Sequence, residues 1–362
     1  MEEWKEYQLG DVCSRLSSGK NISASKISGS DVYPVFGGNG LRGYTDNSNF
    51  TGECAIIGRQ GAFCGNVRFF SGEAYMTEHA VVVCRNEKAN TRYLSYLLST
   101  MNLGRLSGQS AQPGLAVGTL AKQLIKLPPL PTQQKIAAIL SSLDDKIELN
   151  NKINTNLEQQ AQALFKNWFV DFEPFGGKMP EGWKEKTLDT FCNIFTGRKN
   201  ANASVENGKY KFFTCSPNVL PIDSYIFDGD AIIISGNGAY TGRTRFYSGK
   251  FDLYQRTYAC TIKEDQNPDY IFILYWIIKF VLSKKIMGGT HGSAIPYIVM
   301  DDIAKFVINY DEKVFDDLSK IMKSYILQIQ ENENQNEKLA ELRDSLLPKL
   351  MNGEIEVNGI VL

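Results

Sequence analysis

The sequence has few of the residues that usually carry catalysis or bind metal ions. Only two of its 362 residues are His, and its seven Cys form no Cys-x-x-Cys pair. An odd number of Cys without such pairs argues against both a disulfide framework and a zinc site. The chain also lacks the Gly-x-x-x-x-Gly-Lys-Ser/Thr loop, the commonest cradle for nucleotide phosphates. No catalytic apparatus is visible, and we expect neither a cofactor nor a metal ion in this chain.

Long apolar segments are also missing. The apolar run from Tyr270 to Leu282 is too short to span a bilayer and contains Lys279. The N-terminal MEEWKEY is acidic and has no apolar core, which argues against a secretory signal. We therefore expect a cytoplasmic protein with reduced thiols and no membrane contact. Cys13 and Cys192, which occupy matching positions of the repeat described next, are expected to be buried structural thiols.

The sequence does contain an internal duplication. Residues Gly52 to Gly72 read GECAIIGRQGAFCGNVRFFSG, and Gly229 to Gly249 read GDAIIISGNGAYTGRTRFYSG, at an offset of 177. Each copy has a globular part of about 130 residues, enough for its own core, followed by a long helix. Each globular part is predicted to be an α+β domain. The prediction rests on short β-like runs, Gly-rich loops and one or two short helices, at about 91–103 and 268–287.

Two segments predict long helices, each with a heptad seam of apolar and amide residues. The first begins after three prolines near residue 130, with Thr132 as the expected N-cap. Both seams are apolar at their ends and amide-rich in the middle, so antiparallel pairing would set Asn150 and Asn154 against amides of the second helix. A parallel pair would match the polar centres too, but the repeat favours the antiparallel one. The predicted seam residues are Ile136, Leu140, Leu143, Ile147, Asn150, Asn154, Leu157, Ala161, Leu164 and Trp168, and Val314, Leu318, Ile321, Tyr325, Gln328, Asn332, Gln335, Leu339, Leu342 and Leu346.

The predicted fold is thus α+β, with two repeated globular domains separated by two long antiparallel coiled-coil helices in a pseudo-twofold arrangement. Charge follows this division, since the globular parts carry 29 Lys and Arg against 24 Asp and Glu, and the remainder carries 10 against 16. Positive charge on the globular parts suits a polyanionic partner. The expected boundaries are 1–130 and 173–309 for the globular domains, 131–172 and 310–352 for the helices, and 353–362 for a C-terminal tail.

Two short motifs resemble those of methyltransferases. Phe36 to Gly40 matches a Phe-x-Gly-x-Gly adenosylmethionine loop, and Asn267 to Tyr270 comes near Asn-Pro-Pro-Tyr. The first runs into a polar loop where a helix should start, and neither motif occurs in the other copy of the repeat. We therefore interpret Asn267 and Pro268 as the N-cap and first residue of a helix.

The remaining candidates are basic, aromatic and amide side chains on Gly-rich loops, which can contact base edges or phosphates. Arg68 and Arg245 match between the copies, so a shared role such as a phosphate contact or an internal ion pair suits them. The alternative for any single residue is an ordinary solvated loop. The candidate DNA-binding residues are Arg42, Arg59, Gln60, Asn66, Arg68, Gln109 and Gln112 in the first copy, and Asn237, Tyr240, Arg243, Arg245, His291 and Ser293 in the second.

Several segments together resemble the specificity subunit of type I restriction-modification systems. They are the tandem Trp-Lys-Glu openings, the LPPLPTQQKIAAILSSLD helix start at 127–144, ALFKNWFVDF at 163–172 and LLPKLMNGEI at 346–355. The resemblance implies two target-recognition domains held apart by two antiparallel helices, each domain reading one half of a bipartite double-stranded DNA site. It also implies assembly with two modification subunits and with restriction subunits, which bring S-adenosylmethionine, ATP and Mg²⁺ to a chain that is itself non-catalytic.

Two other classes remain open. One is a DNA methyltransferase, which binding of adenosylmethionine by the purified chain would support. The other is a coiled-coil scaffold that binds proteins or glycans, which a DNA-binding assay with random duplex competitors would separate from a DNA-binding protein.

Overall fold

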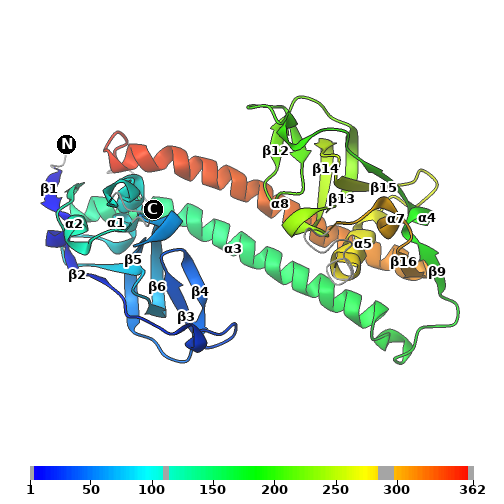
Figure 1. Cartoon of the computed structure of the whole chain (residues 1–362), viewed down its shortest axis with the longest axis horizontal. Helices are drawn as coiled ribbons and strands as arrows, with labels where there is room; N and C mark the ends of the chain where they lie inside the picture. The colour runs from blue at the N-terminus through cyan, green and yellow to red at the C-terminus, as the bar shows by residue number, and fades with distance from the viewer. Residues whose placement is uncertain (1–3, 109–113, 284–296, 358–362) are drawn as a thin grey trace. The chain divides into compact units, whose positions relative to one another are not determined.

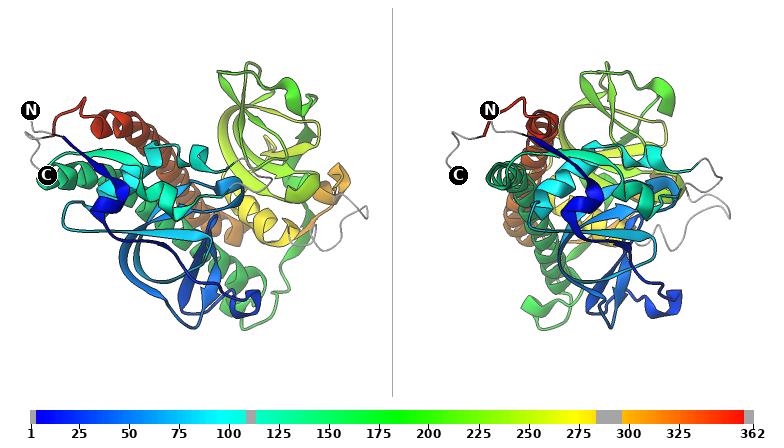
Figure 2. Two further views of the ribbon diagram at one scale, coloured as in Figure 1. Left: turned by 60° about the vertical axis from the view of Figure 1, so that its left-hand side comes forward. Right: turned by 90° about the vertical axis from the view of Figure 1, so that its left-hand side faces the viewer.

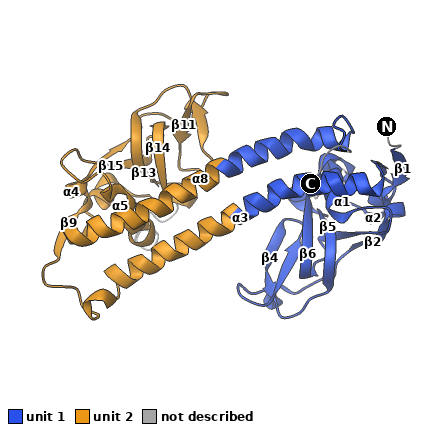
Figure 3. Ribbon diagram, turned by 180° about the vertical axis from the view of Figure 1, so that it is seen from behind, with its two compact units in different colours: residues 1–149, 335–362 blue, residues 150–334 orange. Residues whose placement is uncertain are grey.

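The protein is described by a computed structural model that covers residues 4–108, 114–283 and 297–357. The chain divides into two compact units, coloured separately in Figure 3. Unit 1 comprises residues 1–149 and 335–362, and unit 2 comprises residues 150–334. Each unit therefore contains one globular part together with a portion of both long helices. Among the described residues, no helix is both long enough and apolar enough to cross a membrane.

Unit 1 begins with the globular part, whose elements are labelled in Figure 1. A six-stranded sheet in the order β2-β7-β5-β6-β3-β4 is accompanied by a separate β1–β8 pair. Strand β3 runs parallel to β6, and the other neighbours are antiparallel. The elements are β1 (Lys5–Gln8), β2 (Cys13–Ser18), β3 (Tyr33–Gly37), β4 (Gly40–Thr45), β5 (Phe50–Gly58), β6 (Val67–Met76), β7 (Ala80–Arg85), α1 (Thr91–Thr100), α2 (Val117–Ala121) and β8 (Leu124–Leu127), with short 3-10 turns η1 (Leu9–Val12), η2 (Ala24–Lys26), η3 (Gly61–Phe63) and η4 (Leu103–Leu106).

Unit 2 repeats this topology. Its six-stranded sheet has the order β10-β15-β13-β14-β11-β12, which matches unit 1 strand for strand, and its separate pair is β9–β16. The elements are β9 (Lys184–Thr187), α4 (Leu188–Phe191), β10 (Cys192–Thr196), β11 (Tyr210–Phe213), β12 (Leu220–Ile222), β13 (Phe227–Ser235), β14 (Thr244–Leu253), β15 (Thr257–Ile262), α5 (Tyr270–Ile277), α7 (Met300–Ala304) and β16 (Val307–Tyr310), with the short turns η5 (Glu173–Phe175), η6 (Ala201–Ala203) and η7 (Gly238–Tyr240) and a π-helical turn η8 (Ile278–Leu282).

Each sheet buries apolar side chains on both of its faces. Along β5, Ala55 and Ile57 pack with the helices, whereas Cys54 and Ile56 belong to a smaller cluster on the opposite face. This alternation follows from the two-residue period of a strand. Figure 2 shows that each sheet curves on itself. The smaller clusters of buried side chains belong to these sheets. The continuous apolar runs at the centre of β5 and β13 are therefore buried on both sides.

The two long helices are α3 (Leu130–Phe169) and α8 (Glu312–Met351), each of 40 residues. The predicted N-cap is wrong, because α3 already begins at Leu130 and Thr132 lies in its first turn. The predicted start of the helix at residue 268 is also wrong. Asp269 is the N-cap of α5, and the Asn267 side chain accepts a hydrogen bond from the Asp269 backbone N–H instead. In unit 1 the matching Asn90 does cap α1, accepting from the Tyr93 N–H.

The apparent adenosylmethionine loop adopts a different structure from the one that motif requires. Residues 36–40 comprise the end of β3, the two-residue turn of Gly38 and Asn39 and the start of β4, and no helix follows them. All seven cysteines are free of disulfides, and burial raises the pKa of Cys260 well above its ordinary value and the pKa values of Cys13, Cys54 and Cys192 to about 12. A neighbouring Cys84 raises the pKa of Cys13 and Cys54 further, while Lys263 lowers that of Cys192.

Candidate nucleic-acid interface

In unit 1, several loops at one end of the sheet converge. The β5–β6 loop is joined to the β6–β7 turn by the hydrogen bond from the Arg59 N–H to the His79 carbonyl, 2.9 Å long. The same loop pairs with the segment before α2 through the bridge between Gln60 and Gly114 and through the Leu115 N–H, which donates to the Arg59 carbonyl at 2.9 Å. These backbone bonds hold the loops as one surface.

The predicted residues of unit 1 lie on or beside this surface but differ in what they can contact. Gln60, Asn66 and Arg42 are exposed. Arg59 is half-buried, and its guanidinium donates to the carbonyls of Leu115 and Glu78 at 3.4 and 3.5 Å. Its side chain therefore supports the loop. Gln60 and Asn66, with free access to solvent, are the better candidates for contacts with bases.

Unit 2 presents an equivalent surface. The Gly236 N–H donates to the Arg256 carbonyl at 2.8 Å, and the Ile298 N–H donates to the Gly236 carbonyl at 2.9 Å. Asn237 pairs with Tyr297 where Gln60 pairs with Gly114 in unit 1. The same loops thus converge in both units, although the side chains that they carry differ.

On the unit 2 surface, Tyr240 is 44% exposed and lies under the guanidinium of Arg243, which is 4.8 Å from the ring centroid. Nη1 of Arg243 is buried and has no hydrogen-bond partner among the described residues. Burial and the charge of Arg243 lower the pKa of Arg245, although Glu333 opposes the shift. Two guanidinium groups close together create a locally positive surface, which favours an anionic partner.

The matched pair Arg68 and Arg245 has a shared contact. Nη2 of Arg68 donates to the Asn39 carbonyl, and Nη2 of Arg245 donates to the Ser216 carbonyl, both at 3.2 Å. Arg245 also donates to the carbonyl of Pro217. The shared role seen in the structure is thus to tie the strand after the loop to the neighbouring hairpin, rather than the internal ion pair considered above. Arg68 remains exposed, so a phosphate could still reach it.

Four predicted site residues lie outside the described residues, namely Gln109, Gln112, His291 and Ser293. Two residues on the described surface escaped the sequence analysis. Phe63 is 41% exposed at the position that matches Tyr240, and the exposed Arg256 lies on the turn next to the Gly236 loop. The repeat alignment could have identified Phe63, because it aligns with Tyr240 at the same offset of 177.

The long helices pack as an antiparallel pair in unit 2, with amides at the polar centre of the seam. Nδ2 of Asn332 donates to Oδ1 of Asn154 at 2.7 Å, and Gln328 donates to Oδ1 of Asn332 at 2.9 Å. Farther along, the hydroxyl of Tyr325 donates to Gln160 at 3.2 Å. Residue numbers rise on α3 as they fall on α8, so the predicted antiparallel direction and the predicted meeting of amides are both present.

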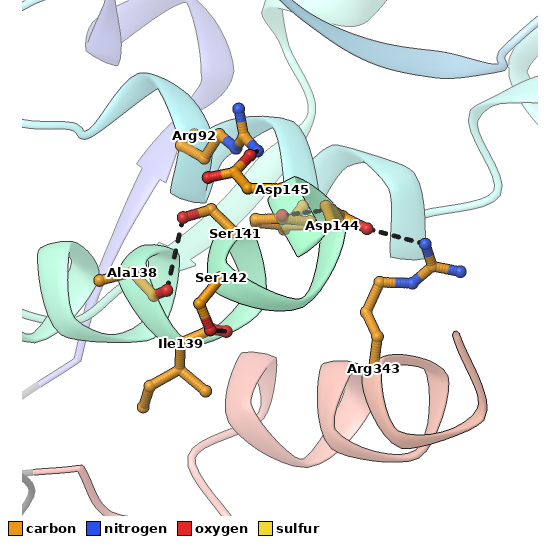
Figure 4. Close-up of polar contacts among 9 residues, drawn as sticks. Arg92, Ala138, Ile139, Ser141, Ser142, Asp144, Asp145 and Arg343 are labelled. Atoms are coloured by element: carbon orange, nitrogen blue, oxygen red, sulfur yellow. Dashed lines mark hydrogen bonds and ion pairs between the residues drawn. The ribbon is translucent and has the colours of Figure 1, made fainter. Parts of the chain in front are cut away.

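In unit 1, the helix pair is joined by charge. Nη1 of Arg343 on α8 lies 2.8 Å from Oδ1 of Asp144 on α3, and the two point toward each other in Figure 4. Asp144 also accepts a hydrogen bond from Tyr96 of α1, and burial together with this bond raises the pKa of the Tyr96 phenol. Arg92 forms an ion pair with Asp145 at 2.6 Å. The network borders a hollow of about 470 Å³ and connects α1 to both long helices.

The predicted seam is correct for one heptad position of α8 and only partly correct for the other, where Val314 is buried and Gln335 half-buried but Gln328 is exposed. Leu318 and Asn332 are buried, but Ile321 and Leu342 are 40% and 47% exposed. The second position instead falls one residue later, where Met322 is buried and Arg343 contacts Asp144. Within unit 2 the reason is that α8 also packs against the globular core, which contains Phe315, Met322 and Ile326 and turns this face inward. The α3 seam residues Ile136, Leu140, Leu143, Ile147, Asn150, Asn154, Leu157, Ala161, Leu164 and Trp168 are all buried or half-buried, as are Tyr325, Leu339 and Leu346 of α8.

Comparison with known proteins places both globular parts in one family. Residues 1–159 and 180–340 each match the type I restriction modification DNA specificity domain. The chain is 44% identical over 146 residues to the EcoprrI specificity subunit of Escherichia coli, which covers 39% of this chain and 36% of that protein. It is 29% identical over 304 residues to the MjaIX specificity subunit of Methanocaldococcus jannaschii, covering 75% of this chain and 70% of the relative.

The fold itself is also found in a solved structure. The S subunit of a type I restriction-modification system from M. genitalium superposes with a TM-score of 0.69 at 17% sequence identity, covering 96% of each chain. At this identity the match shows a shared fold. The match extends over nearly all of both chains, so it includes both globular parts and both long helices.

Proposed function

Because this chain belongs to the family of type I restriction-modification DNA specificity domains, we propose that each of its two units reads one half of a bipartite double-stranded DNA site. The observation that carries the proposal is the pair of equivalent loop surfaces. Their backbone hydrogen bonds are the same in both units, whereas Gln60 is replaced by Asn237 and Asn66 by Arg243 at matching positions. A common frame with different side chains suits two readers of one polymer that recognise different sequences.

The chemistry of these side chains supports base contacts in the major groove. Gln and Asn side chains can form two hydrogen bonds to adenine, and Arg can do so to guanine. In this proposal Arg68 contacts phosphate, which its exposure supports, while Nη2 of its guanidinium donates to the Asn39 carbonyl. The modest positive charge of the globular parts, 29 cationic against 24 anionic residues, adds a weak sequence-independent attraction.

The long helices suit two further roles. They join the units, so their length would set the spacer between the half-sites. They would also bind two modification subunits and, through the complete assembly, the restriction subunits. In this proposal the chain is a non-catalytic cytoplasmic component. S-Adenosylmethionine, ATP and Mg²⁺ would be used by the partners.

Sequencing of methylated sites in a host that carries the chain with its partner subunits tests the proposal. Substituting Ala for Gln60 or Asn66 should relax one half-site only, and substituting Ala for Asn237 or Arg243 should relax only the other, at about 1–3 kcal/mol per lost base contact. Lys250→Ala is a matched control for Arg243→Ala, because it also removes one positive charge from unit 2 but lies at the far end of β14. Equal changes in both half-sites would contradict independent reading.

Assays on the purified chain test whether it binds DNA and whether it lacks catalytic activity. Without partners it should bind DNA weakly, with an affinity that falls steeply as salt rises. It should neither bind adenosylmethionine nor hydrolyse ATP. Turnover by the isolated chain would contradict a non-catalytic role, and failure to bind any duplex in the presence of the modification subunits would favour a scaffold instead.

A further inference from the structure

An exposed aromatic ring occupies the same place in both units. Phe63 ends the short turn η3 and is 41% exposed, and Tyr240 ends the matching turn η7 and is 44% exposed. Scattered exposed apolar residues are normal in soluble proteins. Two rings at matching positions of two loop surfaces, beside positions 60 and 66 whose side chains differ from those of their counterparts Asn237 and Arg243, indicate a shared use.

The backbone beneath each ring is fixed in the same way. In unit 1, Gly58 and Asn66 close the loop with an N–H to carbonyl bond of 2.8 Å, and the Asn66 N–H donates to the Phe63 carbonyl at 3.1 Å. In unit 2, Ser235 and Arg243 close it at 2.9 Å, and the Arg243 N–H donates to the Tyr240 carbonyl at 3.0 Å. A ring held on so short and cross-linked a loop loses little conformational entropy when it binds.

A left-handed glycine starts the turn in each case. Gly61 has φ +77° and Gly238 has φ +82°, and nothing lies within 4 Å of the place where a Cβ would stand on either. Space does not require glycine at these positions. The positive φ does, because it directs the chain so that the aromatic residue ends the turn at the surface.

The immediate neighbours of the two rings differ. Arg243 covers the Tyr240 ring in unit 2, whereas the matching residue in unit 1 is the amide Asn66. Residues that differ between the copies can discriminate between sequences. A feature that is the same in both should act on what both half-sites share, which is the stacked bases themselves, since every base has an aromatic face.

We propose that Phe63 and Tyr240 are wedge residues, each of which inserts its ring against the base stack of one half-site and partly unstacks one base step. This inference rests on the proposed DNA-reading function. Apolar and aromatic side chains are the type that proteins insert between base steps, and they act through the base faces rather than through hydrogen bonds to base edges. The wedge would position each half-site without choosing its sequence.

Fluorescence of 2-aminopurine tests the proposal, because this base analogue brightens when it is unstacked. The probe is a duplex that carries the site found by methylation sequencing, with 2-aminopurine placed at successive positions of one half-site at a time. The full chain, assembled with its modification subunits, is added at saturating concentration. With the unaltered chain, one position in each half-site should brighten in addition to the base that the modification subunits extrude for methylation.

Phe63→Ala should abolish the signal in the half-site read by unit 1 and leave the other unchanged, and Tyr240→Ala should do the converse. Affinity should fall roughly 5- to 150-fold for each. Phe63→Tyr and Tyr240→Phe keep a ring and should retain both signals. Tyr225→Ala is the control, since Tyr225 is 48% exposed but precedes the opposite end of β13.

The outcomes separate this inference from the function on which it rests. Suppose that both Ala variants bind the duplex with the recognised site more tightly than a random duplex and give an unchanged 2-aminopurine signal. This result would overturn the wedge and leave the reading function intact. The absence of any preference in the unaltered assembly would overturn both. Thermal unfolding of each variant shows whether the unit remains folded, and the ring-retaining variants give the answer if an Ala variant does not.

Discussion

Matched insertions into the two long helices test whether they set the spacer between half-sites. The helices pass from one unit to the other between residues 149 and 150 of α3 and between residues 334 and 335 of α8. Four residues added at both points lengthen each connection by about 6 Å, at about 1.5 Å per residue. Four residues exceed one turn of 3.6 residues by about 40°, so each helix keeps nearly the same face toward its partner.

The expected result follows from the rise of DNA, about 3.4 Å per base pair. A lengthening of about 6 Å corresponds to one or two base pairs, so the spacer should grow by that amount while both half-sites keep their sequence. The structure adds a sharper control, which is insertion into one helix only. That change lengthens one connection and not the other, so the polar contacts between the helices cannot all survive.

The contacts at risk lie on either side of the insertion points. They are the Asn332–Asn154 bond of 2.7 Å in unit 2 and the Arg343–Asp144 pair of 2.8 Å in unit 1. A displacement of about 6 Å would break a bond of this length, and a buried polar group left unsatisfied costs about 1–3 kcal/mol. The single insertion should therefore lower the free energy of unfolding, whereas the matched insertion should largely preserve it.

Thermal unfolding of the purified variants measures the change in stability. Methylation sequencing of a host that carries each variant with its partner subunits measures the change in spacer length. An unchanged spacer with full methylation in the matched variant would refute the reasoning, because the helices would then not determine the distance between half-sites. Equal stability of the single and matched insertions would refute the assignment of the helix contacts.

Three further predictions concern individual side chains. Gln60→Glu should weaken binding to DNA in general as well as relaxing one half-site, since it adds a negative charge to the proposed interface, and a salt titration would detect the change. Asn154→Ala should destabilise unit 2 by about 1–3 kcal/mol because it leaves the amide of the buried Asn332 without its acceptor. An unchanged midpoint in chemical denaturation would show that this bond is unimportant. With pKa values near 12 in the folded state, the thiols of Cys54 and Cys192 should be almost unreactive toward iodoacetamide at pH 8 until the chain unfolds. The same raised pKa makes their contribution to stability complete below about pH 9, the ordinary value, and lost as the pH rises toward 12.

The sequence alone was enough to determine the repeat, the two long helices and the polar centre of their seam. These features are written in local patterns. Gly52–Gly72 and Gly229–Gly249 share residues in order, and a seven-residue period requires no knowledge of the rest of the chain. The amide residues could be matched across the seam for the same reason, and the structure joins Asn154 to Asn332.

Only the tertiary structure decided which side of α8 is buried, what the loop side chains contact and how the chain divides. A heptad marks a stripe on a helix, but α8 carries apolar residues on two adjacent stripes, and the core of unit 2 selects Met322 over Ile321. Arg59 and Phe63 are four residues apart in one short loop, yet only folding shows that the Arg59 side chain binds backbone carbonyls and the Phe63 ring faces solvent. Such outcomes depend on residues distant in sequence, like Leu115 and Glu78, whose positions no local pattern specifies.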